Sequence, residues 1–258
     1  MQYKINGTTM QTVEIVLSPG EAVYSQTHQM AWMTTNMGMN TNTGGGVFKA
    51  IKRAFAGASF FITEYSPSDG QGLVAFASIF PGQILARQLA PGETLVCRKD
   101  SFLCAEHSVN LDLYFRQQIG AGLFGGEGFI LQKVTGPGTV FLDMSGEIVE
   151  KDLQAGDMMK VHVGHVGVQD ATVGFNIQMV PGFKNILFGG EGLFLATLTG
   201  PGKVILQSMP ISNLAEEIGR YLHAGGGQAS AAAGGGVLGA VVGGLLNSGG
   251  GGGSSIGW

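Results

Sequence analysis

The sequence predicts an all-β protein made of tandem antiparallel β-sandwich units, and two repeated patterns support this fold class. Residues 123–142 read LFGGEGFILQKVTGPGTVFL, and residues 187–206 read LFGGEGLFLATLTGPGKVIL, 64 residues later. A weaker copy of the start of this phrase, FAGASFFI, occupies residues 55–62. Such self-similarity indicates duplication of one supersecondary unit whose copies bury their apolar faces against each other.

The second pattern is a turn signature, LxxGE or LxxGD. It occurs as LSPGE at residues 17–21, LAPGE at 89–93 and LQAGD at 153–157. Because proline presets φ and glycine accepts a positive φ, Pro19-Gly20 and Pro91-Gly92 predict type II turns. We interpret these turns as hairpin corners.

Period-2 alternation marks the strands between the turns. Two runs of alternating apolar residues, 64 residues apart, are Val109, Leu111, Leu113, Phe115 and Val173, Phe175, Ile177, Met179. Alternation with one apolar face predicts half-buried antiparallel strands. The TGPG segments at 135–138 and 199–202 predict further corners, each followed by a short apolar strand.

These patterns divide the chain into five segments. Residues 1–81 form a first β unit with a helical insertion, residues 82–146 a second unit and residues 147–210 a third. A short helix at 211–224 and a Gly- and Ala-rich tail at 225–258 follow. We expect the three β units to stack around a pseudo-threefold axis.

In the short helix, Asn213 is expected to cap the start, with Glu216 three residues later. Its apolar face is expected to consist of Leu214, Ile218, Tyr221 and Leu222.

The composition limits the partners of the chain. Hydrophobic residues make up 44% of the 258 residues and charged residues only 12%, where about a quarter is typical. Much of the surface is therefore expected to be buried between subunits or to meet lipid. The net charge of −4, with 14 Lys and Arg, provides no broad basic surface, so we expect no nucleic acid partner. The first ten residues lack the features of a secretory signal, which predicts a cytoplasmic protein.

The helical insertion, at residues 44–55, has the pattern of an interfacial helix. Apolar side chains lie beside basic ones at helical spacing, an arrangement that binds the headgroup region of anionic membranes. The expected contact residues are Phe48, Lys49, Ile51, Lys52, Arg53 and Phe55. The alternative is that this helix only covers one end of the β body.

The tail contains two overlapping GxxxG steps, formed by Gly235, Gly239 and Gly243. Such steps let helix backbones approach closely within lipid. The apolar block at 237–246 is shorter than the roughly 20 residues that span a bilayer. Three interpretations remain open: a membrane-interacting or self-associating tail, a flexible linker, and a segment docked on the protein's own body.

No motif in the chain predicts catalysis, a cofactor or a metal site. Residues 120–125 (GAGLFG) match GxGxxG formally, but strand-like residues follow where a dinucleotide site needs a helix. Cys97 and Cys104 are expected to face each other across a hairpin at residues 99–101 and to remain free thiols. Two cysteines do not make a four-cysteine zinc site.

Two histidines and two glutamates are candidate site residues. His162 and His165 converge only if Gly164 makes a turn, and structural histidines are favoured over a metal site. Glu127 and Glu191 recur in GGEG, which suits acid–base chemistry or a cation, but a bulge whose N–H groups the carboxylate accepts is favoured.

Several motifs, taken in order, carry a family resemblance. They are LSPGE, GGGVFKAIKRAFAGASFF, LAPGE with SFLCA, LFGGEGF, VGHVG and GGEGLFLATLTGPGKVILQS. Over residues 13–207 the chain resembles the altered-inheritance-of-mitochondria 24 family. The resemblance implies a triplicated β-sandwich fold similar to the trp RNA-binding attenuation protein, often in a symmetric oligomer, with no catalytic residues to carry over. Mitochondrial members are linked to inner-membrane organisation; lacking a transit peptide, this chain resembles a prokaryotic member.

The sequence therefore predicts a non-enzymatic structural or scaffold protein. It is expected to form a homotrimer and to associate peripherally with the inner face of an anionic membrane. The alternative is a small-ligand-binding module with a pocket between β units, lined by Trp32, Phe102 and Phe129.

Overall fold

The structure is a computed structural model, and it describes residues 1–26, 29–41, 62–117, 128–180 and 194–224. The strands in these residues form four sheets by antiparallel pairing. The first sheet runs β1 (Gln2–Asn6), β2 (Thr12–Leu17), β7 (Gly72–Ala77), β4 (Met30–Met33). The second runs β5 (Met37–Asn40), β6 (Ile62–Pro67), β3 (Val23–Gln26), β10 (Phe102–Glu106), β13 (Gly138–Ser145), β8 (Gly82–Leu89).

The third sheet runs β11 (Asn110–Gln117), β12 (Phe129–Thr135), β9 (Thr94–Arg98), β16 (Val166–Asp170), β19 (Gly202–Gln207), β14 (Ile148–Leu153). The fourth runs β15 (Met158–His162), β18 (Phe194–Thr199), β17 (Gly174–Met179). The predicted all-β class is confirmed.

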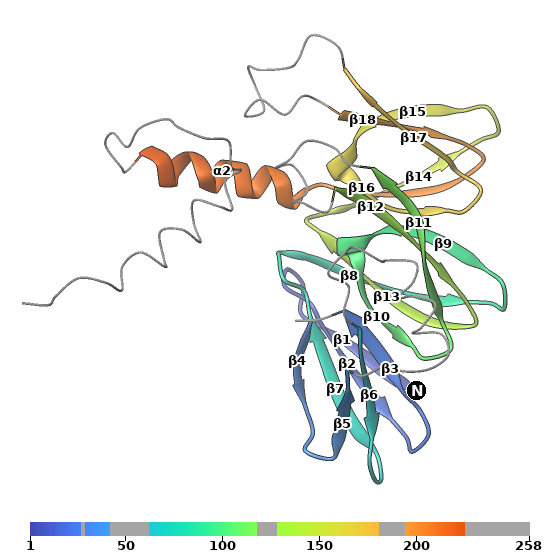
Figure 1. Ribbon diagram of the computed structural model, residues 1–258, viewed down its shortest axis with the longest axis vertical. Helices are drawn as coiled ribbons and strands as arrows, with labels where there is room; N and C mark the ends of the chain where they lie inside the picture. The colour runs from blue at the N-terminus through green and yellow to red at the C-terminus, as the bar shows by residue number, and fades with distance from the viewer. Residues whose placement is uncertain (27–28, 42–61, 118–127, 181–193, 225–258) are drawn as a thin grey trace, which may run out of the picture.

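The sheets are stacked along the long axis of the molecule (Figure 1). A hydrophobic core fills each space between successive sheets. The first core joins Val13 and Phe76 of the first sheet to Val23 of the second. The second core joins the second and third sheets, for example through Tyr24, Phe102, Cys97 and Ile130. The third core joins the third and fourth sheets, for example through Val96, Phe129, Val161 and Leu198.

The second and third sheets are buried on both faces. Adjacent residues of a strand point to opposite faces, so Val23 enters the first core while Tyr24 enters the second. Val96 and Cys97 likewise enter the third and second cores. These strands are therefore apolar at successive positions rather than alternating.

Local chemistry explains the turn signature. Gly20, Gly92 and Gly156 have φ of +89°, +81° and +89°, as the third position of a type II turn requires. The leucine before each turn is buried at the end of a strand. The acidic residue after each glycine accepts a backbone N–H across the turn, each at 2.8 Å: Ser18 to Glu21, Ala90 to Glu93 and Gln154 to Asp157.

The interpretation of these turns as hairpin corners is wrong. The first turn leads from β2 in the first sheet to β3 in the second, and the other two also change sheets. The TGPG corner at 135–138 likewise leads from β12 in the third sheet to β13 in the second. Each corner is an arch between two packed sheets, because its two strands find their pairing partners elsewhere in the chain.

Cys97 and Cys104 are free and buried, as predicted. The expected hairpin between them is wrong, because a 3-10 turn at Lys99–Ser101 carries the chain from β9 in the third sheet to β10 in the second. The two side chains belong to different cores. Burial raises the pKa of the Cys97 thiol to about 12.

Helix α2 (Ile211–Ala224) follows β19 and projects from the stacked sheets (Figure 1). The expected Asn213 cap is wrong, because the helix begins two residues earlier. The N–H groups of Asn213 and Leu214 donate to the carbonyl of Pro210 at 3.0 and 3.3 Å, which places Asn213 inside the first turn.

Candidate functional site

The second and third sheets have the same construction at their centres. In the second sheet β3 pairs with β10, which we call the first junction; in the third sheet β9 pairs with β16, the second junction. The first junction places Ser25 opposite Cys104. At the second, Cys97 is opposite Val168. Ser25 and Cys97 lie the same number of residues after the leucine of the turn signature that precedes each of them.

A recurrent bulge fixes the other strand of each junction. The pairing of β10 with β13 shifts register just before Cys104, and the pairing of β16 with β19 shifts just before Val168. The pairing of β4 with β7 in the first sheet shifts in the same way, just before Trp32. Trp32, Cys104 and Val168 therefore hold corresponding places on β4, β10 and β16.

Two strands in corresponding places lack the junction. Among the described strands, β4 pairs only with β7, and β15 pairs only with β18. Trp32 is 45% exposed, whereas Cys104 and Val168 are 0% and 1% exposed. An edge strand presents a row of N–H and C=O groups to which another chain can pair. These two edges are the candidate functional site of the molecule.

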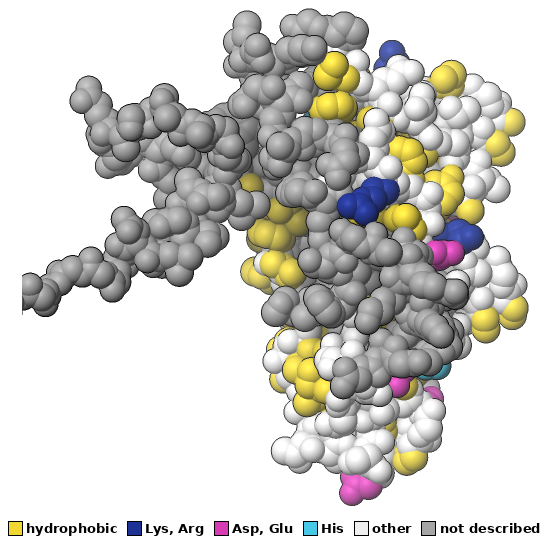
Figure 2. Space-filling model, viewed as in Figure 1, with side chains coloured by type: hydrophobic (Ala, Val, Ile, Leu, Met, Phe, Trp, Pro, Cys, Tyr) yellow, Lys and Arg dark blue, Asp and Glu magenta, His cyan; other side chains and the backbone are white. Residues whose placement is uncertain are grey.

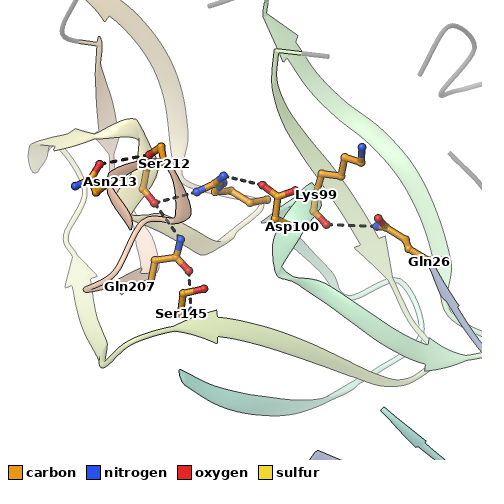
Figure 3. A network of polar contacts seen from close by, with 9 residues as sticks. Gln26, Lys99, Asp100, Ser145, Gln207, Ser212 and Asn213 are labelled. Carbon is orange, nitrogen blue, oxygen red and sulfur yellow. Dashed lines mark hydrogen bonds and ion pairs between the residues drawn. The ribbon is translucent and has the colours of Figure 1, made fainter. Parts of the chain in front are cut away.

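Buried polar side chains close the second junction (Figure 3). Arg98 donates to the carbonyl of Gly164 at 2.9 Å and to Asp100 at 2.8 Å. The amide of Gln207 donates to the same carbonyl at 3.0 Å and accepts the N–H of Ser145 at 3.1 Å. These bonds tie the second and third sheets to the turn after β15, so the cluster has a structural role.

The first junction is closed by amides instead. Gln26, at the end of β3, donates to the carbonyl of Lys99 at 3.3 Å (Figure 3) and to the side chain of Gln132 at 3.4 Å. Gln29 donates to the carbonyl of Phe102 at 3.0 Å. Both junctions therefore end in side-chain donors that bind the carbonyls of a neighbouring turn.

The conditional prediction for the two histidines is confirmed. The 3-10 turn at Val163–His165 brings the rings of His162 and His165 to a centroid distance of 5.8 Å. His165 Nδ1 lies 2.8 Å from the carbonyl of Gln207. Burial lowers the pKa of His162, and the positive charges of His165 and Arg98 lower it further. In the described part of the chain, no group of three His, Cys, Asp or Glu is arranged to hold a metal ion.

The three aromatic residues proposed to line a ligand pocket do not come together. Phe102 stacks on Tyr24 in the second core, with ring centroids 5.6 Å apart. Phe129 stacks on Phe175 in the third core, at 5.7 Å. Trp32 lies on the edge of the first sheet. Phe102 and Phe129 are core residues because apolar strands cover them on both sides.

The expected membrane-contact residues, Phe48, Lys49, Ile51, Lys52, Arg53, Phe55, Gly235, Gly239 and Gly243, lie outside the described residues, as do Glu127 and Glu191. None of the helices described here has the length and apolarity needed to cross a bilayer. On the face shown in Figure 2, described Lys and Arg side chains are few and well separated.

Sequence reasoning missed the two open edges. The signal was present in the alignment of the turn signatures, which places Lys160 of β15 where β3 and β9 have Tyr24 and Val96. Tyr24 and Val96 are fully buried, while Lys160 is exposed. A lysine among buried apolar residues at corresponding places indicates an edge strand.

Layered antiparallel sheets joined by arches define a β-sandwich protein, and β4 and β15 are edge strands of its two end sheets among the described strands. The family described as Mitochondrial biogenesis AIM24 matches residues 3–209, and the chain belongs to this family. The resemblance seen in the sequence motifs is confirmed.

Two similar proteins come from the bacterium Streptococcus pyogenes. An uncharacterized protein of Streptococcus pyogenes serotype M6 is 35% identical over 219 residues, which cover 81% of this chain and 86% of the relative. The X-ray structure of a Streptococcus pyogenes protein is similar with a TM-score of 0.70 and 29% identity. The similarity covers 85% of this chain and 99% of the solved one.

Proposed function

We propose that this protein is a non-enzymatic scaffold that assembles with copies of itself into a homotrimer. The observation that carries the proposal is the pair of open edges, β4 and β15, which correspond to strands that are paired inside the chain. Edges of this kind favour association when the partner strand is supplied by another chain.

The proposal includes three tandem β-sandwich units, as in the trp RNA-binding attenuation protein, that follow one another along the long axis (Figure 1) and do not close around a pseudo-threefold axis within one chain. The strands β2–β7, β8–β13 and β14–β19 would be the three units, within residues 1–81, 82–146 and 147–210. The support is that the turn signature joins the first two strands of each set and the bulge lies in the third. Each unit then gives three strands to one sheet and three to the next.

A structural role also suits the polar groups of the described residues. Arg98 and Gln207 bind turn carbonyls, and Asp143 accepts the hydroxyl of Ser78 at 2.8 Å. These hydrogen bonds hold turns and neighbouring strands in place.

Native mass spectrometry tests the assembly. A trimer is expected, and a strictly monomeric protein at all concentrations would contradict the proposal. A broad hydrolase and redox screen tests the non-enzymatic part, which an activity abolished by one point mutation would overturn. A thermal-shift panel of metabolites tests the alternative, because a ligand at 100 times its Kd adds about 2.7 kcal/mol of stability.

We also propose a cytoplasmic protein bound peripherally to anionic membrane, supported by the sequence of residues 44–55 and 235–243 alone. Liposome flotation tests it with the full chain and a chain truncated after Ala224. Flotation is expected only with anionic vesicles and is expected to weaken on truncation, since three tails of a trimer act together. If neither chain floats, the membrane association is wrong.

A further inference from the structure

We propose that β15 of one chain pairs antiparallel with β4 of a second copy, in the register of the two internal junctions. This inference rests on the proposed self-assembly and names the surface that forms it. The described residues contain the same strand pairing twice, between β3 and β10 and between β9 and β16. Among the described strands, β15, which corresponds to β3 and β9, and β4, which corresponds to β10 and β16, are left without this pairing.

The internal junctions specify the register. Ser25 is opposite Cys104 at the first junction, and Cys97 is opposite Val168 at the second. Val161 holds the place of Ser25 and Cys97 on β15. The proposed pairing therefore places Val161 opposite Trp32 of the partner subunit. Lys160 is then opposite Met33 of the partner subunit.

The hydrogen-bond pattern of the first junction carries over as well. The N–H of His107 donates to the carbonyl of Ala22 at 3.0 Å, so the pair two residues along, Ala105 and Tyr24, also exchanges backbone hydrogen bonds. Lys160 corresponds to Tyr24, so its N–H points to the open side of β15. Val161 belongs to the alternate pair, in which side chains approach more closely.

The burial pattern fits the same pairing. Cys104 enters the first core, beside residues of the preceding unit, and Val168 enters the second core in the same way. Trp32 of a partner subunit would extend the third core, which already contains Val161. Pairing would thus remove a 45% exposed indole from water.

The two edges belong to opposite ends of the stack. The first sheet, with β4, and the fourth sheet, with β15, lie at opposite ends of the long axis (Figure 1). The contact therefore joins different chains head to tail. Repetition of a heterologous contact closes a ring when the rotation allows it, and the proposed trimer is such a ring.

Lys160 explains how the open edge stays soluble before assembly. A charged lysine on an edge strand discourages indiscriminate pairing. In the trimer its ammonium group would lie where Tyr24 and Val96 are fully buried at the internal junctions. The charge weakens the pairing, so replacement of Lys160 by valine is expected to strengthen assembly.

Disulfide trapping tests the register directly. Two single variants, Trp32→Cys and Val161→Cys, are purified separately, mixed and oxidised. A cross-linked dimer is expected in the mixture and not in either variant alone. Tyr114→Cys, on the edge strand β11, replaces Trp32→Cys as the matched control, and the unsubstituted chain with its buried Cys97 and Cys104 gives the background. Cross-links within a single variant, or none in the mixture of a trimeric protein, would overturn the inference.

A second test changes the backbone N–H of Lys160, which points to the open edge of β15. Proline is tolerated on an edge strand where its missing N–H faces solvent, so Lys160→Pro is expected to fold and to lose the trimer. Lys160→Ala keeps the N–H and is expected to remain trimeric. A trimer unchanged by Lys160→Pro contradicts the inference while leaving self-assembly intact. A strictly monomeric wild-type protein contradicts both the inference and the proposed function.

Discussion

The interior junctions and the two ends of the stack are built from corresponding strands, yet they differ in burial. Cys104 on β10 is 0% exposed, whereas Trp32 at the corresponding place on β4 is 45% exposed. Val96 on β9 is buried, whereas Lys160 on β15 is exposed. Whether a residue is buried therefore depends on whether another strand or sheet lies on the side of its strand that faces the end of the stack. The strand itself forms in both settings.

The difference also appears in residue chemistry. Interior strands place apolar residues on both faces because a core lies on each side. The end strand β15 directs Val161 into the third core and exposes Lys160. A strand that must be stable both as an exposed edge and with a partner strand on that edge needs one apolar face and an edge that resists unspecific pairing.

The largest effect is expected for truncation of an interior aromatic residue. Phe102→Ala removes a fully buried ring from the second core, so the free energy of unfolding should fall by about 3–5 kcal/mol. Trp32→Ala, at the open end, should change the stability of the monomer by less than about 1 kcal/mol. Urea unfolding followed by circular dichroism measures both. Equal losses of unfolding free energy in the two variants would show that the interior junctions and the ends of the stack do not differ in their contribution to stability.

Gly200 tests the contacts of an interior arch. A Cβ at this position would overlap the carbonyl oxygen of Gln154, so Gly200→Ala should cost about 2 kcal/mol of stability or more. Gly156→Ala is the control: its Cβ would meet nothing within 4 Å, although φ is +89°. It should cost about 1 kcal/mol for the left-handed backbone alone. A larger loss for Gly156→Ala in thermal unfolding would contradict the close packing of the arch.

Gln207 tests the polar closure of the second junction. Gln207→Leu leaves the buried N–H of Ser145 without its side-chain acceptor and removes a donor to Gly164. The expected loss is about 1–3 kcal/mol in the free energy of unfolding. Gln117→Leu, an exposed position on the edge strand β11, should leave stability nearly unchanged. Indistinguishable urea midpoints for the two variants would show that the closure contributes nothing.

The smallest effect is expected at Asp143, and it depends on pH. Burial raises the pKa of this carboxyl, against weaker opposing hydrogen bonds from Ser78 and the Ile79 backbone. The folded state then holds its proton to higher pH than the unfolded state. The contribution of this group to stability is therefore lost as pH rises from its unfolded pKa through its folded pKa.

Asp143→Asn keeps an acceptor for Ser78 and removes the buried charge. It should be more stable than wild type at neutral pH and should depend less on pH between about 3 and 7. Asp152→Asn, at an exposed carboxylate, is the control. Chemical unfolding across this range measures both, and a destabilised Asp143→Asn protein at neutral pH would show that the carboxylate is favourable inside the stack.

The sequence by itself determined the all-β class and the turns. Gly20, Gly92 and their acidic neighbours determine turn geometry through interactions within four residues, and these interactions can be read from composition and spacing. The alternation of apolar residues predicted strands for the same reason. The short helix was also visible, although Pro210 rather than Asn213 precedes its first turn.

Only the tertiary structure decided which strands pair and which edges stay open. A turn such as Pro91-Gly92 has the same local chemistry in a hairpin and in an arch, so the sequence did not distinguish them. Cys97 and Cys104 entered different cores because β9 and β10 pair with strands distant in the chain. The exposure of Trp32 followed from the place of β4 at the end of the first sheet. Strand pairing is non-local, and local residues carry little information about the neighbour that a strand will find.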